Sequence, residues 1–224
     1  VPDIVRDSLV AFVAAICAAV WLKLFEVLTS LGWLDSRLSR KLIHITVGPG
    51  FVITWLFYSN SPSARLFASV GPAIFALSLA LIGIGVIGRS GLVKAMSRSG
   101  RVEELVKGPF YYVLITMASA LFFWRSLPGG AIALGMMCGG DGLADVIGRR
   151  FGSSKLPWNR SKSFAGSAAM FCGGWATSSI LVALLSLVSG EFVLSRNLWT
   201  SLPIIATFVT IVESLPFNTE TINR

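Results

Sequence analysis

The feature that most constrains this chain is a series of apolar segments, each about long enough to cross a bilayer as a helix. Seven of them, separated by short polar loops, fall at about residues 8–31, 42–58, 66–88, 109–124, 128–147, 164–188 and 198–215. Such a helix needs about 20 mostly apolar residues, and only 13% of the 224 residues are charged. We therefore predict an all-α, polytopic integral membrane protein with about seven transmembrane helices. Residues 1–224 form one domain, with no room for a separate soluble catalytic domain.

The basic residues are distributed unevenly between the two ends of these predicted helices. The chain has 19 Lys and Arg against 11 Asp and Glu, a net charge of +8. Fourteen basic residues fall in segments 32–41, 89–108 and 148–163 and in the C-terminal tail, which alternate on one side. The opposite side has Arg6, Arg65, Arg125 and Arg196, and Lys23 lies within the first segment. The bias predicts that the basic side faces the cytoplasm, or the stroma of an organelle.

Two partners can account for this excess of positive charge. Anionic lipid headgroups attract basic segments at a membrane surface, and a phosphate-bearing substrate would do the same. We expect membrane lipids among the partners, and we expect no nucleic acid. The three cysteines lie in apolar segments without a Cys-x-x-Cys or Cys/His cluster, which argues against a zinc site or a disulfide framework.

Several ionisable residues lie near the basic-side ends of the apolar segments. Asp141, Asp145 and Glu213 do so, as do Glu26 and the single histidine, His44. Ionisable groups at such depth are costly and are functional candidates by default. These residues are predicted to lie on the same side of the membrane, as an active site at one membrane face requires.

The run GGDGLADVIGRRFG, residues 139–152, contains the strongest candidate site. Asp141 and Asp145 are four residues apart, so both carboxylates can face one point from a helix. Mg²⁺ takes one or two carboxylates and lets phosphate oxygens complete its shell. The glycines allow close approach of the backbone to a ligand, and Arg149 and Arg150 can contact phosphate. The alternative is a glycine-kinked helix whose acids pair structurally with these arginines.

A basic, serine-rich loop follows at residues 155–167 and enters the next apolar segment. It contains Lys155 and Lys162, and Ser163 stands at the N-cap position. A helix N-terminus after lysines is a ready anion site. The alternative is a solvated basic loop that meets lipid headgroups. The loop is not a Walker A sequence, and no Gly-x-Ser-x-Gly hydrolase motif is present.

Weaker candidates come from three other segments. Arg40, Lys41 and His44 share one helix face by their spacing, which favours phosphate contact, with His44 as proton acceptor or hydrogen-bond donor. Lys107 follows Glu103 by four residues and can form a helical ion pair with it. Glu213 could supply a third metal-binding or general-base carboxylate. The alternatives are an interfacial histidine, a solvated amphipathic helix, and an interfacial glutamate beside a helix end.

The central run GGDGLADVIGRRFGSSKLPWNRSKSFAGS resembles the polyprenol kinase family, in particular its plant plastid phytol kinase and farnesol kinase branch. RKLIH at 40–44, EELVKGPFYYVL at 103–114 and VESLP at 212–216 are similar to it in the same order. The resemblance implies a chloroplast multi-pass enzyme that uses CTP to phosphorylate phytol, farnesol or geranylgeraniol. It also implies a role in phytol salvage toward tocopherol, or in farnesol recycling.

The residues and the resemblance together give a set of predicted roles. Asp141, Asp145 and Glu213 are the candidate Mg²⁺ ligands, and Asp141, Asp145 and His44 are the candidate catalytic groups. The predicted nucleotide-binding residues are Gly140, Gly142, Gly148, Arg149, Arg150, Gly152, Lys155, Lys162, Ser163, Gly166, Arg40, Lys41 and Lys107. The prenyl alcohol is expected to enter from the bilayer, with its hydroxyl toward the basic side. We expect no protein partner.

Both ends of the chain depart from the expected pattern. The chain begins at Val1 without a visible transit peptide. The family resembled usually follows Glu-Ser-Leu-Pro with an Asp-Asn-hydroxyl motif and a further apolar span, whereas here residues 217–224 follow it. We therefore expect a C-terminal end that is truncated by one span.

Two other functions stay open from the sequence. The Asp-x-x-x-Asp-x-x-Gly run with Lys-Ser-x-x-Gly is also similar to membrane CDP-diacylglycerol synthases, so a CTP:phospholipid cytidylyltransferase is one alternative. A non-enzymatic lipid transporter is the other. Transporters place their polar groups near the bilayer midplane, whereas these residues gather toward one side.

Overall fold

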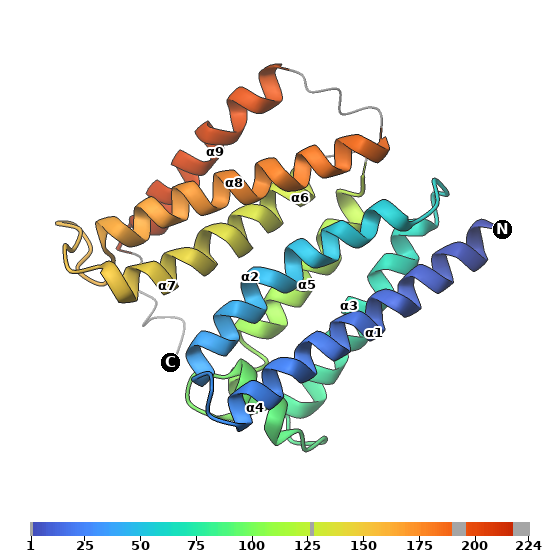
Figure 1. Ribbon diagram of the computed structural model, residues 1–224, viewed down its shortest axis with the longest axis horizontal. Helices are drawn as coiled ribbons and strands as arrows, with labels where there is room; N and C mark the ends of the chain where they lie inside the picture. The colour runs from blue at the N-terminus through green and yellow to red at the C-terminus, as the bar shows by residue number, and fades with distance from the viewer. Residues whose placement is uncertain (1, 126–127, 190–195, 217–224) are drawn as a thin grey trace.

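The computed structural model describes residues 2–125, 128–189 and 196–216, and within them every regular element is helical (Figure 1). The α-helices are α1 (Asp3–Ser30), α2 (Ser36–Thr54), α3 (Ala64–Gly83), α4 (Ser90–Met96), α5 (Gly108–Phe122), α6 (Gly129–Gly135), α7 (Gly142–Phe151), α8 (Phe164–Ser189) and α9 (Arg196–Ser214). Three short helices are η1 (Trp55–Phe57), η2 (Val102–Glu104) and η3 (Met136–Asp141). The predicted all-α class is confirmed.

Among the described residues, five helices are long and apolar enough to span a membrane. They are Asp3–Ser30, Ala64–Gly83, Val102–Phe122, Gly129–Phe151 and Phe164–Leu187. The predicted segments 42–58 and 198–215 coincide with α2 and α9, which do not meet those criteria. The predicted count of seven is therefore not confirmed. Three basic residues fall within the first six residues of α2, which shortens its apolar stretch.

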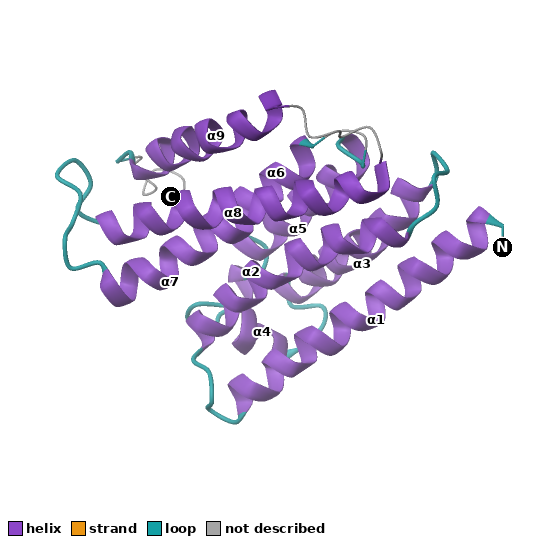
Figure 2. Cartoon of the chain, turned by 45° about the horizontal axis from the view of Figure 1, so that its top comes forward, coloured by secondary structure: helices purple, strands orange, loops and turns teal. Residues whose placement is uncertain are grey.

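Helix α2 lies between two groups of helices (Figures 1 and 2). Helices α1, α3 and α4 lie on one side of it, and α6, α7, α8 and α9 lie on the other, while α5 contacts both α3 and α6. It contacts α1 and α4 in the first group, and α7, α8 and η3 in the second. Residues on α2 can therefore join the two halves of the molecule.

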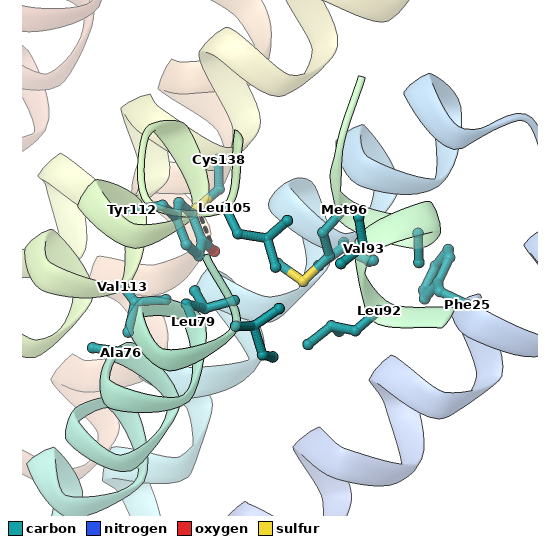
Figure 3. Packing of buried hydrophobic residues seen from close by; sticks show 13 residues of the cluster. Phe25, Ala76, Leu79, Leu92, Val93, Met96, Leu105, Tyr112, Val113 and Cys138 are labelled. Atoms are coloured by element: carbon teal, nitrogen blue, oxygen red, sulfur yellow. Dashed lines mark hydrogen bonds between the residues drawn. The ribbon is translucent and has the colours of Figure 1, made fainter. Parts of the chain in front are cut away.

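Each half has its own apolar cluster. In the first, Leu92 and Met96 of α4 and Leu79 of α3 are almost fully buried and belong to one cluster with Leu105 (Figure 3). The second surrounds α8 and includes Leu134, Leu181 and Leu202 from α6, α8 and α9. A fully buried leucine contributes about 1.5–3 kcal/mol relative to an exposed one. Many large apolar side chains are also exposed, such as Phe12 and Ile74, as expected for helices that face lipid.

Helices α6 and α7 form one continuous helical run, because the π-helical segment η3 joins them. The run packs closely on α8 through small residues. A Cβ at Gly139 would collide with Thr177 and with the backbone of Gly173, so the two helices approach each other backbone to backbone. Single-turn π-segments occur often at functional sites. This one ends at Asp141, a predicted site residue.

The end of the molecule opposite to the basic loops has its own buried polar cluster. Asp7 is fully buried and accepts hydrogen bonds from the backbone N–H and the hydroxyl of Ser59. Arg125 is also buried and donates to the carbonyls of Trp55, Tyr58 and Ser59. These contacts fix the connection between α2 and α3, so the cluster has a structural explanation.

Candidate functional site

The predicted carboxylate pair meets one lysine from α2. Lys41 Nζ lies 2.9 Å from Asp141 Oδ2 and 3.8 Å from Asp145 Oδ2. The lysine side chain is only 13% exposed, whereas those of Asp141 and Asp145 are 46% and 34% exposed. The buried lysine lies on one side of the two carboxylates, and their other side is partly exposed. Both acids can therefore reach a ligand.

His44 lies one turn after Lys41 on the same face of α2. Its Nε2 is 2.8 Å from the carbonyl oxygen of Met137 and 3.5 Å from Asp141 Oδ2. Because a carbonyl only accepts, the Nε2 nitrogen must carry the hydrogen in that bond. The ring also packs against Tyr112, with centroids 4.6 Å apart, and the Tyr112 hydroxyl donates to the His44 carbonyl. His44 is thus fixed from three sides.

The two arginines that follow the aspartates differ in their contacts. Arg149 pairs with Asp145 one turn earlier, and its Nε also donates to the Asp145 carbonyl. Arg150 is exposed and lies over the ring of Phe151 at 5.6 Å. The structural alternative for this run, acids paired with arginines, therefore holds for Asp145 and Arg149. Asp141 pairs with Lys41 from another helix instead.

The basic loop between α7 and α8 is closed by backbone contacts. Lys155 and Ser163 form an antiparallel bridge, and Leu156 N–H donates to the Lys162 carbonyl. Ser163 Oγ accepts a hydrogen bond of 3.1 Å from the N–H of Gly166, the third residue of α8. The predicted N-cap is confirmed, and the Ser163 side chain is buried beneath the loop.

The same loop is tied to the end of α9. Lys162 forms an ion pair with Glu213. Trp158 Nε1 donates to Ser214 Oγ at 3.3 Å, and Asn159 donates to the Ser214 carbonyl at 3.1 Å. We call these contacts the loop–α9 latch. Sequence reasoning missed Trp158 and Asn159, although both stand within the motif run.

The structure separates Glu213 from the aspartate pair. No three His, Cys, Asp or Glu side chains in the described residues are grouped closely enough to hold a metal ion. The proposed third carboxylate therefore does not join Asp141 and Asp145 in such a group, because Glu213 is engaged by Lys162 in the latch. Lys162 in turn interacts electrostatically with Asp141.

The glycines predicted to approach a nucleotide make their close contacts with the protein itself. A Cβ at Gly142 would collide with Ile45 of α2, and one at Gly140 would lie 2.9 Å from Met170 Sδ. A Cβ at Gly148 would lie 3.3 Å from Gly166 Cα, where α7 crosses α8. A Cβ at Gly152 would collide with Ser163 Oγ and with the Gly148 carbonyl. Helix packing accounts for these glycines.

Arg40 and Lys107 lie on the side of the site toward α5. A Cβ at Gly108 would lie 2.5 Å from Arg40 Nη2, so this guanidinium packs against the start of α5. Burial, followed by the charge of Arg98, lowers the pKa of Arg40 from its usual value. Lys107 is exposed at the residue before α5. The predicted Glu103–Lys107 pair is absent from the ion pairs of the described residues, where Glu104 instead pairs with Arg101.

Two half-exposed carboxylates beside a buried lysine fit a magnesium–phosphate site. Mg²⁺ prefers oxygen ligands and is usually bound through one or two carboxylates plus substrate phosphates. Asp141 and Asp145 supply that donor set, and Lys41 supplies positive charge beside it. The chemistry that such an arrangement supports best is transfer of a phosphoryl or nucleotidyl group, since both depend on positioning and charge neutralisation.

The names of similar plant proteins support this chemistry. The chain is 39% identical over 215 residues to "Probable phytol kinase, chloroplastic" of Zea mays, which covers 96% of the chain and 71% of the relative. It is 46% identical over 195 residues to "Phytol kinase 1, chloroplastic" of Arabidopsis thaliana, covering 86% and 63%. It is 35% identical over 218 residues to "Farnesol kinase, chloroplastic" of Arabidopsis thaliana, covering 97% and 69%.

The chain belongs to the chloroplastic phytol kinase and farnesol kinase family. The kinase names of these relatives support a kinase enzyme, and their chloroplastic location agrees with the predicted compartment. The chain spans 63% of the Arabidopsis phytol kinase and 71% of the maize protein. No family model matches the chain, and no solved structure matches it.

Proposed function

We propose that this chain is a CTP-dependent kinase that phosphorylates a prenyl alcohol, such as phytol, farnesol or geranylgeraniol, to its monophosphate. The observation that carries the proposal is the pair of half-exposed carboxylates, Asp141 and Asp145, held by Lys41 in a chain of this family. The product would serve phytol salvage toward tocopherol or farnesol recycling in a chloroplast membrane.

The aspartates are the proposed magnesium ligands. When bound, Mg²⁺ supplies charge neutralisation on the triphosphate of CTP. Asp141 is the more available of the two, since Asp145 is also engaged by Arg149. Lys41 and Arg149 border the carboxylates and would neutralise further phosphate charge. Positioning and charge neutralisation are the main requirements of phosphoryl transfer, so these residues suffice for it.

His44 acts in this scheme as a positioning residue. Its Nε2–H is donated to the Met137 carbonyl, so that nitrogen cannot take a proton from the substrate hydroxyl. The contact instead holds the π-helical turn that leads to Asp141. The proton of the attacking hydroxyl then passes to one of the two carboxylates, whose side chains are partly exposed.

The loop–α9 latch is the proposed boundary of the nucleotide site. Lys155 and Lys162 border the loop, and Lys162 interacts with both Glu213 and Asp141. The buried Ser163 cap orders the first turn of α8 beside them. Arg40 and Lys107 extend the basic surface toward α5, where longer phosphate or ribose groups of a nucleotide can lie.

The deciding experiment assays purified protein with phytol, farnesol and geranylgeraniol against CTP, ATP, GTP and UTP. We expect a prenyl monophosphate and CDP from CTP in the presence of Mg²⁺. Release of pyrophosphate with a phospholipid acceptor would identify a cytidylyltransferase instead. Movement of lipid in proteoliposomes without any nucleotide would identify a transporter. Either result would overturn the kinase proposal.

A further inference from the structure

We propose that an apolar groove between α6, η3, α8 and α9 binds the hydrocarbon tail of the prenyl alcohol and sets the chain length that the site accepts. The inference rests on the proposed function and deepens it by locating one part of the substrate. The groove has a volume of about 430 Å³ and is lined by Gly129, Ile132, Ala133, Met136, Met137, Met170, Ile205 and Val209. All of these residues are apolar.

The groove lies on the inner side of α9. Ile205 and Val209 line it and are only partly exposed, whereas their neighbours Ile204 and Phe208 are 68% and 67% exposed. The two pairs therefore belong to different faces of the same helix. One face borders the groove, and the other faces outward, where a membrane protein meets lipid. A tail in the groove would lie along the inner face of α9.

Three methionines give the groove an adaptable wall. Met136, Met137 and Met170 are three of the five methionines in the chain. Methionine is unbranched and polarisable, and it fits irregular apolar partners better than branched side chains do. A prenyl chain has a methyl branch at every repeat, so its outline is irregular. The composition of the groove thus suits a methyl-branched chain.

One end of the groove, at Met137, lies four residues before Asp141 in the same helical run. The Met137 carbonyl accepts the hydrogen bond from His44, and His44 lies 3.5 Å from Asp141. Met170, on the opposite wall, packs against Gly140, the residue before Asp141. The end of the groove at Met137 and Met170 is therefore its end nearest to the carboxylates. That juxtaposition matches a molecule with one polar hydroxyl and one long apolar tail.

The other end of the groove lies at the start of α6. Gly129 is eight residues before Met137, and a helical rise of 1.5 Å per residue gives the groove a length of about 12 Å. Ala133 lies midway between these two ends, and Ile205 lines the groove from α9. Larger side chains at these positions would shorten the groove. The shortened groove would still hold a short tail next to the hydroxyl, but it would not hold a long one.

The experiment replaces two residues that line the groove, Ala133 and Ile205, with larger ones. It then compares the activity with alcohols of different chain length. Ala133→Phe and Ile205→Trp should lower kcat/KM for phytol and geranylgeraniol by at least about tenfold, while geraniol is affected much less. The KM for CTP should not change. Ile204→Trp is the matched control, because the same residue is added on the outward face of α9. It should leave the activity with all alcohols unchanged.

A second measurement is independent of turnover and of these variants. A farnesol analogue with a photoactivatable diazirine at its tail should label Met170, Ile205 or Val209 of the wild-type protein, and excess farnesol should suppress the labelling. A diazirine phospholipid should label the outward face at Ile204 or Phe208 instead. Labelling of the groove by the phospholipid, unaffected by farnesol, would show that a membrane lipid occupies it and would overturn the proposal.

The outcomes distinguish failure of this inference from failure of the proposed function. The wild type, Ile205→Trp and Ile204→Trp could all turn over prenyl alcohols with the same preference for chain length. That result would overturn the proposal that the groove binds the tail, and it would leave the proposed kinase activity intact. Farnesol-suppressed labelling without phosphorylation by any nucleotide would support the groove and overturn the kinase. Labelling confined to residues outside the groove would overturn the tail site in either case.

Discussion

Lys41 Nζ donates a hydrogen bond of 2.9 Å to Asp141 Oδ2, joining two helices across 100 positions of the sequence. The lysine is mostly buried, and the carboxylate is half exposed. This relationship places a fixed positive charge behind the acid and leaves its open side toward a ligand. Substitutions at this pair and at neighbouring residues can separate its chemical role from its structural role.

The first prediction concerns the Asp141 carboxylate. Asp141→Asn should reduce phosphoryl transfer by at least about 100-fold, because the amide cannot neutralise a bound cation at a developing phosphoryl charge. The protein should still insert and run as a monodisperse species in detergent. Asp35→Asn is the matched control at the same end of the molecule. Asp35 caps α2 by accepting from Leu38 N–H, and Asn caps a helix equally well.

Asp35→Asn should therefore keep full activity. The rates are measured by formation of prenyl monophosphate, and the effect on the metal is measured by the Mg²⁺ concentration for half-maximal rate. Full activity in Asp141→Asn would show that the carboxylate holds no metal required for transfer.

The second prediction tests whether Lys41 and Asp141 act as a unit. Lys41→Met should lower the rate by about tenfold or more, because a partly buried carboxylate loses its charge partner. The double variant with Asp141→Asn should lose little beyond the larger single effect, since neighbours in one network are not additive. Arg37→Met, an exposed residue of the same helix, should change the rate little. Additive effects of the two substitutions would contradict a functional pair.

The third prediction separates a positioning role of His44 from proton transfer. His44→Gln keeps an N–H donor near the Met137 carbonyl, whereas His44→Ala removes it. If the bond to Met137 is the essential contact, the Gln variant should retain a substantial part of kcat and the Ala variant should not. The pH profile of the Gln variant should follow that of the wild type. Equal loss in both variants, with a flattened profile, would indicate that His44 transfers a proton.

The fourth prediction concerns the loop–α9 latch. Lys162→Met and Glu213→Gln remove the two sides of one ion pair. Each should raise the KM for CTP by about fivefold, corresponding to about 1 kcal/mol for a partly exposed pair, and the two effects should not add. The Mg²⁺ requirement should not change. A loss in Glu213→Gln as large as that in Asp141→Asn, with a higher Mg²⁺ requirement, would restore Glu213 as a metal ligand.

The sequence alone was sufficient to predict the local features of the site. A spacing of four predicts that Asp141 and Asp145 share a helix face, and Lys41 lies within 4.0 Å of both. Ser163 was predicted as an N-cap from its place before an apolar segment, and the cap is present. These features depend on the geometry of one helix or one turn, which the sequence determines almost alone.

The parts that depend on packing between helices could not be predicted. Glu213 stands near the same membrane side as the aspartates, but only the tertiary structure shows that Lys162 engages it. The glycines were interpreted as a ligand cradle because glycine permits close approach by any partner. In the structure the partner of Gly148 is α8. The bond between His44 and Met137 involves a backbone carbonyl, for which a sequence contains no side-chain signal.

The last prediction tests that structural explanation of the glycines. Gly152→Ala should lower the melting temperature in detergent, because a Cβ there would collide with Ser163 Oγ and the Gly148 carbonyl. Overpacking of this kind costs about 1–3 kcal/mol. Gly50→Ala is the matched control, since its Cβ would meet no atom within 4 Å. In the interior of α2 that change should be neutral or stabilising by up to about 1 kcal/mol.

Both glycine variants are then assayed for CTP binding at a temperature well below either melting point. If packing of the loop against α7 is the main role of Gly152, Gly152→Ala will lower the melting temperature more than it affects CTP binding. A variant that keeps the wild-type melting temperature but shows a raised KM for CTP would indicate that the glycine makes room for the nucleotide. Because Gly50 lies in an open position, its variant shows what an added methyl group does without a collision.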